Sequence, residues 1–333
     1  MRAQRSAPTT HRPLSVARRR VLLGAALPWL LPLTACGPRR PLVLAGHPWP
    51  GYEPMFLARS LGYLPKDLSL LEAPTVQASI DAVKNGSADG AMLTLDEILL
   101  LRDEGVPLQI VLVFDVSKGA DVLLARPTLK RLTDLKGRRI GAEGSALGSL
   151  MLAMVLEKAG LRLEDVRVQR IVYDEHESAW ATGGLDALVT YEPVATRLKK
   201  TGARQLLSTR EMPDTIFDVL AVRTGALETH GHILRASLDG HFKALSYLRQ
   251  NPWDAAYQTA QHLGVSAEEM IASLRGLELP DLIGNQRYLS AQDGDLRRVT
   301  SKLSAIMLQA GIIRQPVDTR LLYSGAYLPA TAT

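Results

Sequence analysis

The sequence of 333 residues has a single cysteine, Cys36, and its aromatic residues make up only 5% of the chain. One cysteine excludes an internal disulfide, so the folded protein depends on burial of apolar side chains for its stability. The hydrophobic content of 46% is ample for packed cores in a chain of this length. The sequence also has no His-Glu-x-x-His, Walker or Gly-x-Ser-x-Gly motif, and we therefore expect no enzyme activity.

Excess basic charge is confined to the N-terminal segment. The net charge of +5 includes six arginines that precede Cys36, in a stretch without any acidic residue. The rest of the chain has nearly equal numbers of acidic and basic residues, which gives no electrostatic reason to bind nucleic acid. We therefore expect no nucleic-acid partner.

The N-terminal segment predicts export and lipidation. Arg18 to Arg20 precede the apolar run Val21 to Ala35, which is interrupted by two prolines. This run is too short to anchor stably in a bilayer of about 30 Å, and Leu-Thr-Ala before Cys36 is typical of a lipoprotein cleavage site. We expect residues 1–35 to be a signal peptide of the general secretory or twin-arginine route. Cys36 is then the lipid-bearing residue of a membrane-anchored, extracytoplasmic protein, with an ordinary small core cysteine as the alternative.

From Pro41 onward, short β-like runs alternate with helical segments, a pattern typical of a mostly parallel α/β sheet covered on both faces. Residues 121–126 and 218–223 have similar sequences and bracket a second α/β unit, which predicts a two-strand hinge. Helical periodicity follows Thr224, and we expect these helices to pack on the first unit. The expected lobes are residues 36–121 with 222–333, and residues 122–221.

Four segments carry a family resemblance. They are Trp49 to Pro54 (Trp-Pro-Gly-Tyr-Glu-Pro), Asn85 to Ala91, Asp134 to Gly141 and Asp186 to Pro193. Together the chain resembles periplasmic solute-binding proteins of the nitrate, sulfonate, taurine and thiamine-precursor type. This resemblance implies a two-lobed, type II-like periplasmic binding fold. It further implies a monomer that closes on a small molecule and delivers it to an ABC permease in the membrane, without a cofactor.

In open α/β sheets a ligand binds beyond the carboxyl ends of the strands, near the N-termini of the following helices. Applied to this chain, that rule nominates several loops and the return strand of the hinge. The candidate ligand-binding residues are Trp49, Tyr52, Glu53, Asp96, Asp115, Ser117, Ser145, Gly148, Asp174, Glu175, Thr190, Glu192 and Asp218.

Most of these candidates have a purely structural alternative. The two aromatic residues Trp49 and Tyr52 either stack on a planar ligand or pack against a neighbouring element. Ser145 either helps bind an anion at a helix start or is an ordinary N-cap. Glu53 and Glu192 either bind an amine or interact favourably with a helix dipole. Residues 174 and 175 have a solvated helix start as their alternative.

The charge of the candidate loops indicates the class of ligand. Acidic residues predominate there, and Lys118 is the lone basic side chain among them. We therefore expect an amine-bearing or N–H-rich heteroaromatic ligand, such as a thiamine-precursor-like aminopyrimidine. A sulfonate, taurine or nitrate held by backbone N–H groups near Ser145 is the alternative. A pyrimidine-synthase-like enzyme and a sensory binding module also remain open. Glu228-x-His230-x-His232 lacks further metal ligands, and we interpret it as a solvated helix start.

Overall fold

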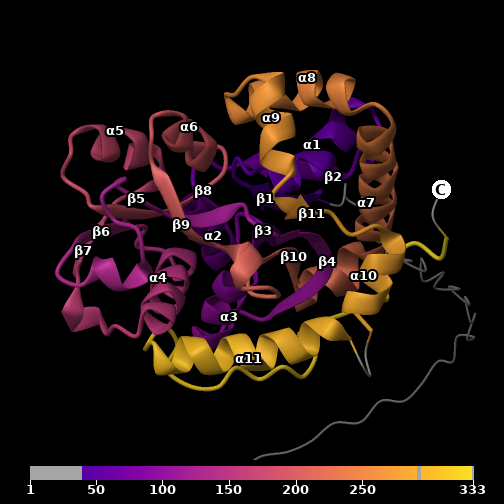
Figure 1. The fold of residues 1–333 in the computed structure, drawn as a ribbon. Coiled ribbons are helices and arrows are strands. Elements are labelled where there is room, and N and C mark those ends of the chain that lie inside the picture. Colours follow the sequence, from indigo (N-terminus) through magenta and orange to yellow (C-terminus); the bar gives the residue numbers. More distant parts are fainter. Residues whose placement is uncertain (1–39, 291–293, 332–333) are drawn as a thin grey trace, which may run out of the picture. The chain divides into compact units, whose positions relative to one another are not determined.

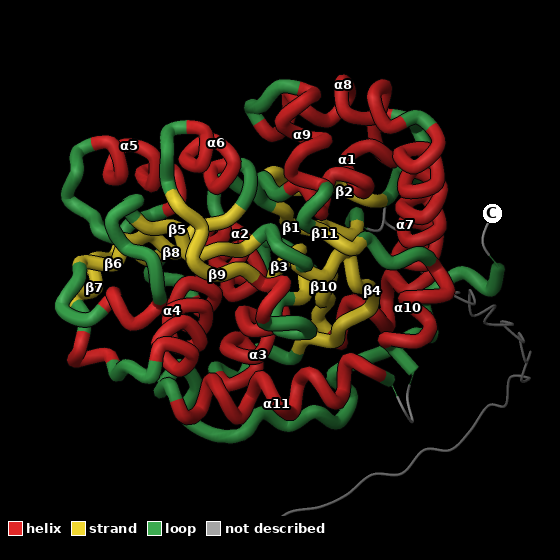
Figure 2. Tube along the Cα trace, in the orientation of Figure 1, coloured by secondary structure: helices red, strands yellow, loops and turns green. Residues whose placement is uncertain are grey.

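The computed structural model describes residues 40–290 and 294–331. The predicted signal peptide and Cys36 lie outside these described residues. Within them, no helix combines the length and the apolar character that a membrane span requires. The chain from Arg40 onward forms one compact unit with two β-sheets, each flanked by helices (Figures 1 and 2). We call each sheet with its helices a lobe.

The first lobe contains a sheet with the strand order β11-β4-β10-β3-β1-β2. Strands β1, β2 and β3 run parallel, whereas β10 runs antiparallel to both β3 and β4. The central strands are buried along most of their length, as expected when helices cover both faces. The strands are β1 (Leu42–Gly46), β2 (Leu68–Glu72), β3 (Gly90–Thr94), β4 (Leu108–Ser117), β10 (Phe217–Arg223) and β11 (Leu277–Glu278).

The second lobe contains a sheet with the order β7-β6-β8-β5-β9. Strand β6 is parallel to β7 and β8, and β5 is antiparallel to β8 and β9. All of its strands come from one continuous stretch of the chain. They are β5 (Asp121–Ala125), β6 (Arg139–Ala142), β7 (Arg167–Arg170), β8 (Ala187–Tyr191) and β9 (Arg204–Ser208).

The helices that follow the strands begin and end at residues that cap them. The Thr75 and Ser145 side chains accept hydrogen bonds from backbone N–H groups at the starts of α2 and α4. Gly86 and Gly160 end these helices in the left-handed conformation that glycine adopts without strain. The α-helices of this part are α1 (Glu53–Ser60), α2 (Val76–Asn85), α3 (Leu95–Asp103), α4 (Ala146–Ala159), α5 (His176–Ala181) and α6 (Val194–Lys200). The short 3-10 helices are η1 (Pro50–Tyr52), η2 (Leu132–Leu135), η3 (Leu163–Asp165), η4 (Tyr173–Glu175) and η5 (Thr209–Glu211).

The helices after Thr224 pack on the first lobe, as the sequence predicts. Helix α7 contacts α1 and the first sheet, α8 and α9 pack on each other, and α11 lies along α3 (Figure 1). His230 lies inside α7 and is buried, with Nε2 3.1 Å from the Arg40 carbonyl oxygen, so its interpretation as part of a solvated helix start is wrong. These helices are α7 (Thr224–Gln250), α8 (Pro252–Leu263), α9 (Ala267–Leu274), α10 (Leu282–Tyr288) and α11 (Asp295–Gln309).

Two segments, residues 118–120 and 209–216, connect the sheets. They are joined where the Ser117 and Thr209 hydroxyls lie 2.7 Å apart and Gly119 N donates to Thr209 Oγ1 at 2.8 Å. The two strands expected to form the hinge, β5 and β10, belong to different sheets. The chain therefore changes sheet slightly earlier than the predicted boundaries at residues 121 and 222, and the lobe boundaries themselves stay a prediction.

A further contact between the lobes joins α6 to α9. Arg197 forms an ion pair with Glu177 of its own lobe, with Nη1 and Oε1 2.8 Å apart. Its Nε donates to Glu269 Oε1 of the first lobe at 3.1 Å. The other Glu269 oxygen accepts a hydrogen bond from Ser266 N, which fixes the carboxylate at the start of α9.

Candidate ligand-binding cleft

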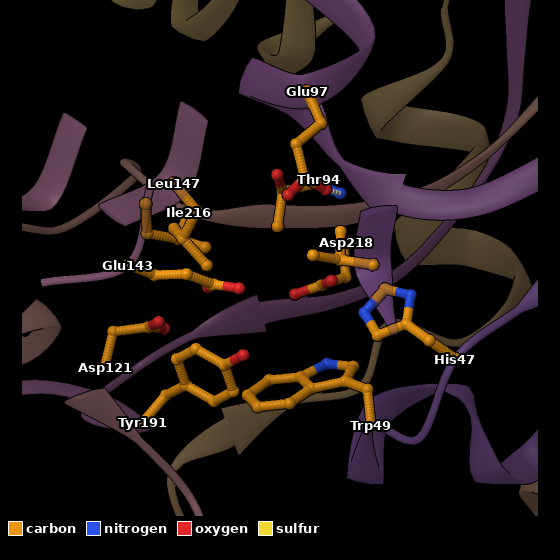
Figure 3. Close-up of a pocket in the computed structure, with 11 residues that line it drawn as sticks. His47, Trp49, Thr94, Glu97, Asp121, Glu143, Leu147, Tyr191, Ile216 and Asp218 are labelled. Carbon is orange, nitrogen blue, oxygen red and sulfur yellow. Dashed lines mark hydrogen bonds between the residues drawn. The ribbon is translucent and has the colours of Figure 1, made fainter. Parts of the chain in front are cut away.

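A cleft lies between the two sheets, and both lobes contribute side chains to it (Figure 3). The cavity between these side chains has a volume of about 20 Å³, which is room for about one water molecule. A larger solute therefore requires the two walls to move apart. The residues that line it are His47, Trp49, Val76, Thr94, Glu97, Asp121, Glu143, Leu147, Tyr191, Ile216 and Asp218.

Strand pairing brings the polar side chains of the cleft together. In the first sheet, Asp218 pairs with Thr94 on β3 and with Asp115 on β4. In the second sheet, Asp121 on β5 pairs with Tyr191 on β8. Because residues directly opposite one another on paired strands share a face of the sheet, each lobe presents its own polar group toward the cleft.

Aromatic side chains form one wall of the cleft. Trp49 of the first lobe contacts Tyr191 of the second edge to face, with ring centroids 5.6 Å apart. Tyr191 stacks on Tyr173 at 4.2 Å with nearly parallel rings. Such faces attract planar groups and cations, so this wall suits a ligand that has either.

Behind this wall, two buried carboxyl groups orient the aromatic residues of the first lobe. Trp49 Nε1 donates to Asp115 Oδ2 at 3.0 Å, and the Tyr52 hydroxyl donates to Asp218 Oδ1 at 2.6 Å. Tyr52 and Asp115 are fully buried and do not line the cleft. A Cβ on Gly51 would collide with the Asp115 carboxylate and the Trp49 indole, so this turn requires a glycine for close approach.

The carboxyl groups in and behind the cleft are held in their protonated form more strongly than in water. Removal from water raises the pKa of Asp115 to about 8, of Asp96 to about 7 and of Asp121 to about 6. Burial also raises the pKa of Asp218 and Glu97 well above their ordinary values. Among the described residues, none of these five groups is within ion-pair distance of a lysine or arginine.

Acidic groups also face one another across the cleft. After burial, the next cause of the raised Asp218 pKa is the charge of Asp115, which lies opposite it on the neighbouring strand. Glu97 on α3 repels Glu143 on the opposite lobe, although burial and Asp96 raise its pKa more. Burial likewise raises the pKa of Glu143.

Several of these oxygens have no hydrogen-bond partner in the described part of the chain. They include both carboxyl oxygens of Asp96 and one each of Asp115 and Asp121. Glu97 is better supported, because Oε2 accepts a hydrogen bond from Thr94 N at 2.9 Å, as in a helix capping box. Of these three residues Asp121 lines the cleft, and because an unpaired buried acceptor is costly, its free oxygen favours a ligand that donates a hydrogen bond.

The structure places some predicted site residues away from the cleft. Glu53 is buried between α1 and α8, where Oε1 lies 2.6 Å from His262 Nδ1. Ser117 is fully buried in the connection between the lobes. Thr190 points away from the cleft, with Oγ1 3.0 Å from His176 Nδ1. Direct ligand contact by these residues stays a prediction.

Other predicted residues flank the second-lobe side. Glu192 accepts a hydrogen bond from Thr196 N at 2.9 Å and forms an ion pair with Lys199. Asp174 and Glu175 form the short helix η4, and neither is buried. These positions fit the structural alternatives weighed from the sequence, and no contact places them in the cleft lining.

Ser145 and Gly148 begin helix α4 at the edge of the cleft. Gly148 N donates to Ser145 Oγ at 3.1 Å, and the Ser145 hydroxyl donates to Glu143 Oε2 at 3.2 Å. Ser145 is therefore an N-cap, and it also borders a second groove of about 1250 Å³ between α4 and α11. Glu143, two residues before Ser145, is the acidic residue of this segment that lines the main cleft.

Sequence reasoning placed Glu143, Tyr191 and His47 in the nominated loops but did not single them out as site residues. Tyr191 follows the predicted Thr190, and alternation along β8 turns their side chains to opposite faces. Pairing of β8 with β5 would have identified Tyr191, because it lies opposite Asp121. His47 follows β1 directly, and burial lowers its pKa to about 4, so it is a neutral cleft residue.

Residues 49–255, more than half of the chain, match the family described as NMT1/THI5 like. The chain belongs to the NMT1/THI5-like family. The taurine-binding periplasmic protein of Escherichia coli is 21% identical over 220 residues, covering 64% of this chain and 66% of that protein. An aliphatic sulfonates-binding protein of the same organism is 24% identical over 274 residues, covering 80% of this chain and 83% of that protein.

Solved structures show the two-lobed fold of this family member. The periplasmic aliphatic sulphonate binding protein SsuA from Escherichia coli superposes with a TM-score of 0.70 at 19% identity, covering 86% of this chain and 92% of that one. The desulfurization enzyme DSZB superposes with a TM-score of 0.64 at 18% identity, covering 87% and 97%. Binding proteins and an enzyme thus share this fold, and the fold alone does not decide between binding and catalysis.

Proposed function

We propose that this chain is an extracytoplasmic solute-binding protein that captures a small amine-bearing or N–H-rich heteroaromatic molecule and delivers it to an ABC importer. The observation that supports this class of ligand is that four carboxyl groups line the cleft, those of Glu97, Asp121, Glu143 and Asp218. Within the described residues, none of them pairs with a lysine or arginine. A cation or a strong hydrogen-bond donor supplies the partner that these groups lack.

The same groups give a reason for the lobes to close around ligand. Like charges on opposite walls repel one another, so an empty closed cleft is electrostatically unfavourable. A ligand cation between the walls reverses the sign of this interaction and stabilises the closed form. Trp49 and Tyr191 then cover the ligand with aromatic surface.

The test is a binding screen of the purified protein by thermal shift, with calorimetry on the hits. We expect amines and aminopyrimidines to raise the melting temperature, because a ligand that binds only the folded state adds stability. Taurine, alkanesulfonates and nitrate serve as the matched anion set. Tight binding of alkanesulfonates or nitrate, together with no binding of amines that lack a sulfonate, would contradict the proposal.

A sulfonate or taurine ligand is the second candidate function. Two observations favour it, namely the names of the curated relatives and the start of α4 beside the cleft, where backbone N–H groups suit an anion. Taurine has both an ammonium and a sulfonate group, so it satisfies either argument. Alkanesulfonates and nitrate, which have no ammonium group, therefore separate these candidates in the binding screen.

The import role further requires that the protein is held near its permease, and we propose a lipid on Cys36 for this purpose. The support is the sequence pattern before this cysteine, together with the periplasmic relatives. Replacing Cys36 with alanine should move the protein from the membrane fraction to the soluble fraction, while ligand affinity stays unchanged. A variant that remains in the membrane fraction would contradict lipid anchoring.

A further inference from the structure

The acidic groups of the cleft are distributed over both walls. Glu97 and Asp218 belong to the first lobe, and Asp121 and Glu143 belong to the second. In Figure 3 the carboxyl groups of Glu143 and Asp218 point toward the same central space from opposite sides. A ligand between the walls therefore meets acidic groups at both of its ends.

We propose that the ligand has two positively charged nitrogen centres separated by a short apolar spacer, one for the acids of each lobe. This inference rests on the proposed function and narrows it from one cationic group to two. The cavity between the walls is only about 20 Å³, so even after the walls separate we expect room for a spacer of no more than a few carbon atoms.

Apolar side chains are placed to contact such a spacer. Val76 and Ile216 line the cleft together with Leu147 of helix α4, and the Trp49 and Tyr191 rings form the adjacent wall. Methylene groups gain free energy when they pack against apolar and aromatic surface. A single compact cation would leave this surface, and the acids of one wall, without a partner.

Charge balance supports the same conclusion. On the first-lobe side, Asp115 lies opposite Asp218 on the neighbouring strand, and among the described residues neither carboxyl group is paired with a basic side chain. On the second-lobe side, Asp121 faces Glu192, and Glu143 lies close to Asp174. Among the described residues, no basic side chain neutralises Asp121 or Glu143, whereas Lys199 is paired with Glu192. With one ligand cation per lobe, the acidic groups of both walls therefore have a positively charged partner.

The experiment compares ligands that differ in one end group. Calorimetry at neutral pH measures the affinity of the purified protein for 1,4-diaminobutane, n-butylamine and 4-aminobutyrate. We expect the diamine to bind at least about tenfold more tightly than butylamine, since a charged hydrogen bond contributes about 1.5–3 kcal/mol. We expect the amino acid to bind more weakly than butylamine, because its carboxylate faces the acids of one wall.

Substitution of one acidic residue of the second lobe tests whether that lobe binds the second cation. Glu143→Gln should weaken diamine binding more than monoamine binding, and so reduce the preference for the diamine to less than about threefold. The matched control is Glu157→Gln, an exposed position on helix α4, which should keep the full preference. Diamine binding should also release protons from the buried acids, seen as a dependence of the binding enthalpy on the buffer.

The outcomes separate this inference from the proposed function. Equal affinity for the diamine and the monoamine would overturn the two-cation inference and leave the amine receptor intact. A preference that Glu143→Gln does not change would also overturn it, because the second cation would then lie elsewhere. Absence of binding by every amine would overturn both proposals.

Discussion

Replacing Asp121 with asparagine should stabilise the folded protein at neutral and alkaline pH. Burial, together with the nearby Glu192 carboxylate, raises the pKa of Asp121 from 3.8 to about 6. The folded state therefore retains this proton at pH values where the unfolded chain has lost it. The free energy of unfolding of the natural protein falls as pH rises through this window, and the loss is complete above about pH 6.

The magnitude follows from the size of the shift. A change of one pKa unit corresponds to about 1.36 kcal/mol, so a shift of roughly two units costs about 3 kcal/mol above pH 6. Asparagine has no charge to bury and avoids this cost. Below about pH 4 the aspartic acid is protonated in both states, and the two proteins should have similar stability.

Urea unfolding followed by circular dichroism, at pH values of about 4, 6 and 8, measures this difference. The natural control is Asp134→Asn, because hydrogen bonds from Lys130 N and Arg131 N lower the pKa of that exposed aspartate. The control should therefore lose stability at pH 8 rather than gain it. A stability difference for Asp121→Asn that is the same at every pH would refute the reasoning, as would destabilisation at pH 8.

Three further substitutions have defined outcomes. Gly51→Ala should weaken ligand binding more than about tenfold in calorimetry, because the added methyl group displaces the cleft tryptophan, whereas Gly225→Ala has free space and should not. Thr209→Val should lower the free energy of unfolding in urea by about 1–3 kcal/mol, since it leaves the buried partners of this hydroxyl unpaired. Arg197→Gln should speed ligand dissociation up to about fivefold in stopped-flow experiments without changing association, while Arg204→Gln on exposed β9 should change neither rate.

Local sequence signals predicted most of the fold. The capping residues Thr75 and Ser145, and the C-terminal glycines Gly86 and Gly160, mark helix ends that can be read from the sequence, because these preferences act within one helical turn. The sequence did not predict β11, which has two residues and forms only by pairing with β4. The partition of β5 and β10 into different sheets is also a property of long-range pairing.

The candidate site was less predictable than the fold. Asp218 and Trp49 were found because they follow or precede strands at the edge where ligands bind. Glu143 was not singled out, since the serine two residues later offered a stronger local signal as a helix cap. Which acids reach the cleft depends on the direction of each side chain, and on partners such as the His262 ring that contacts Glu53 from a distant helix.

The place of β10 in the first sheet has a consequence for the order of folding. This strand lies between β3 and β4, although more than 90 residues separate it from either of them in the sequence. Strands β3 and β4 therefore have no strand to join them until the ribosome has synthesised β10, which ends at residue 223. The second sheet, whose strands are continuous in sequence, is complete before that point and is free to form first. We thus expect the second lobe to fold first. The first lobe then completes its sheet when β10, its late-synthesised central strand, pairs with β3 and β4.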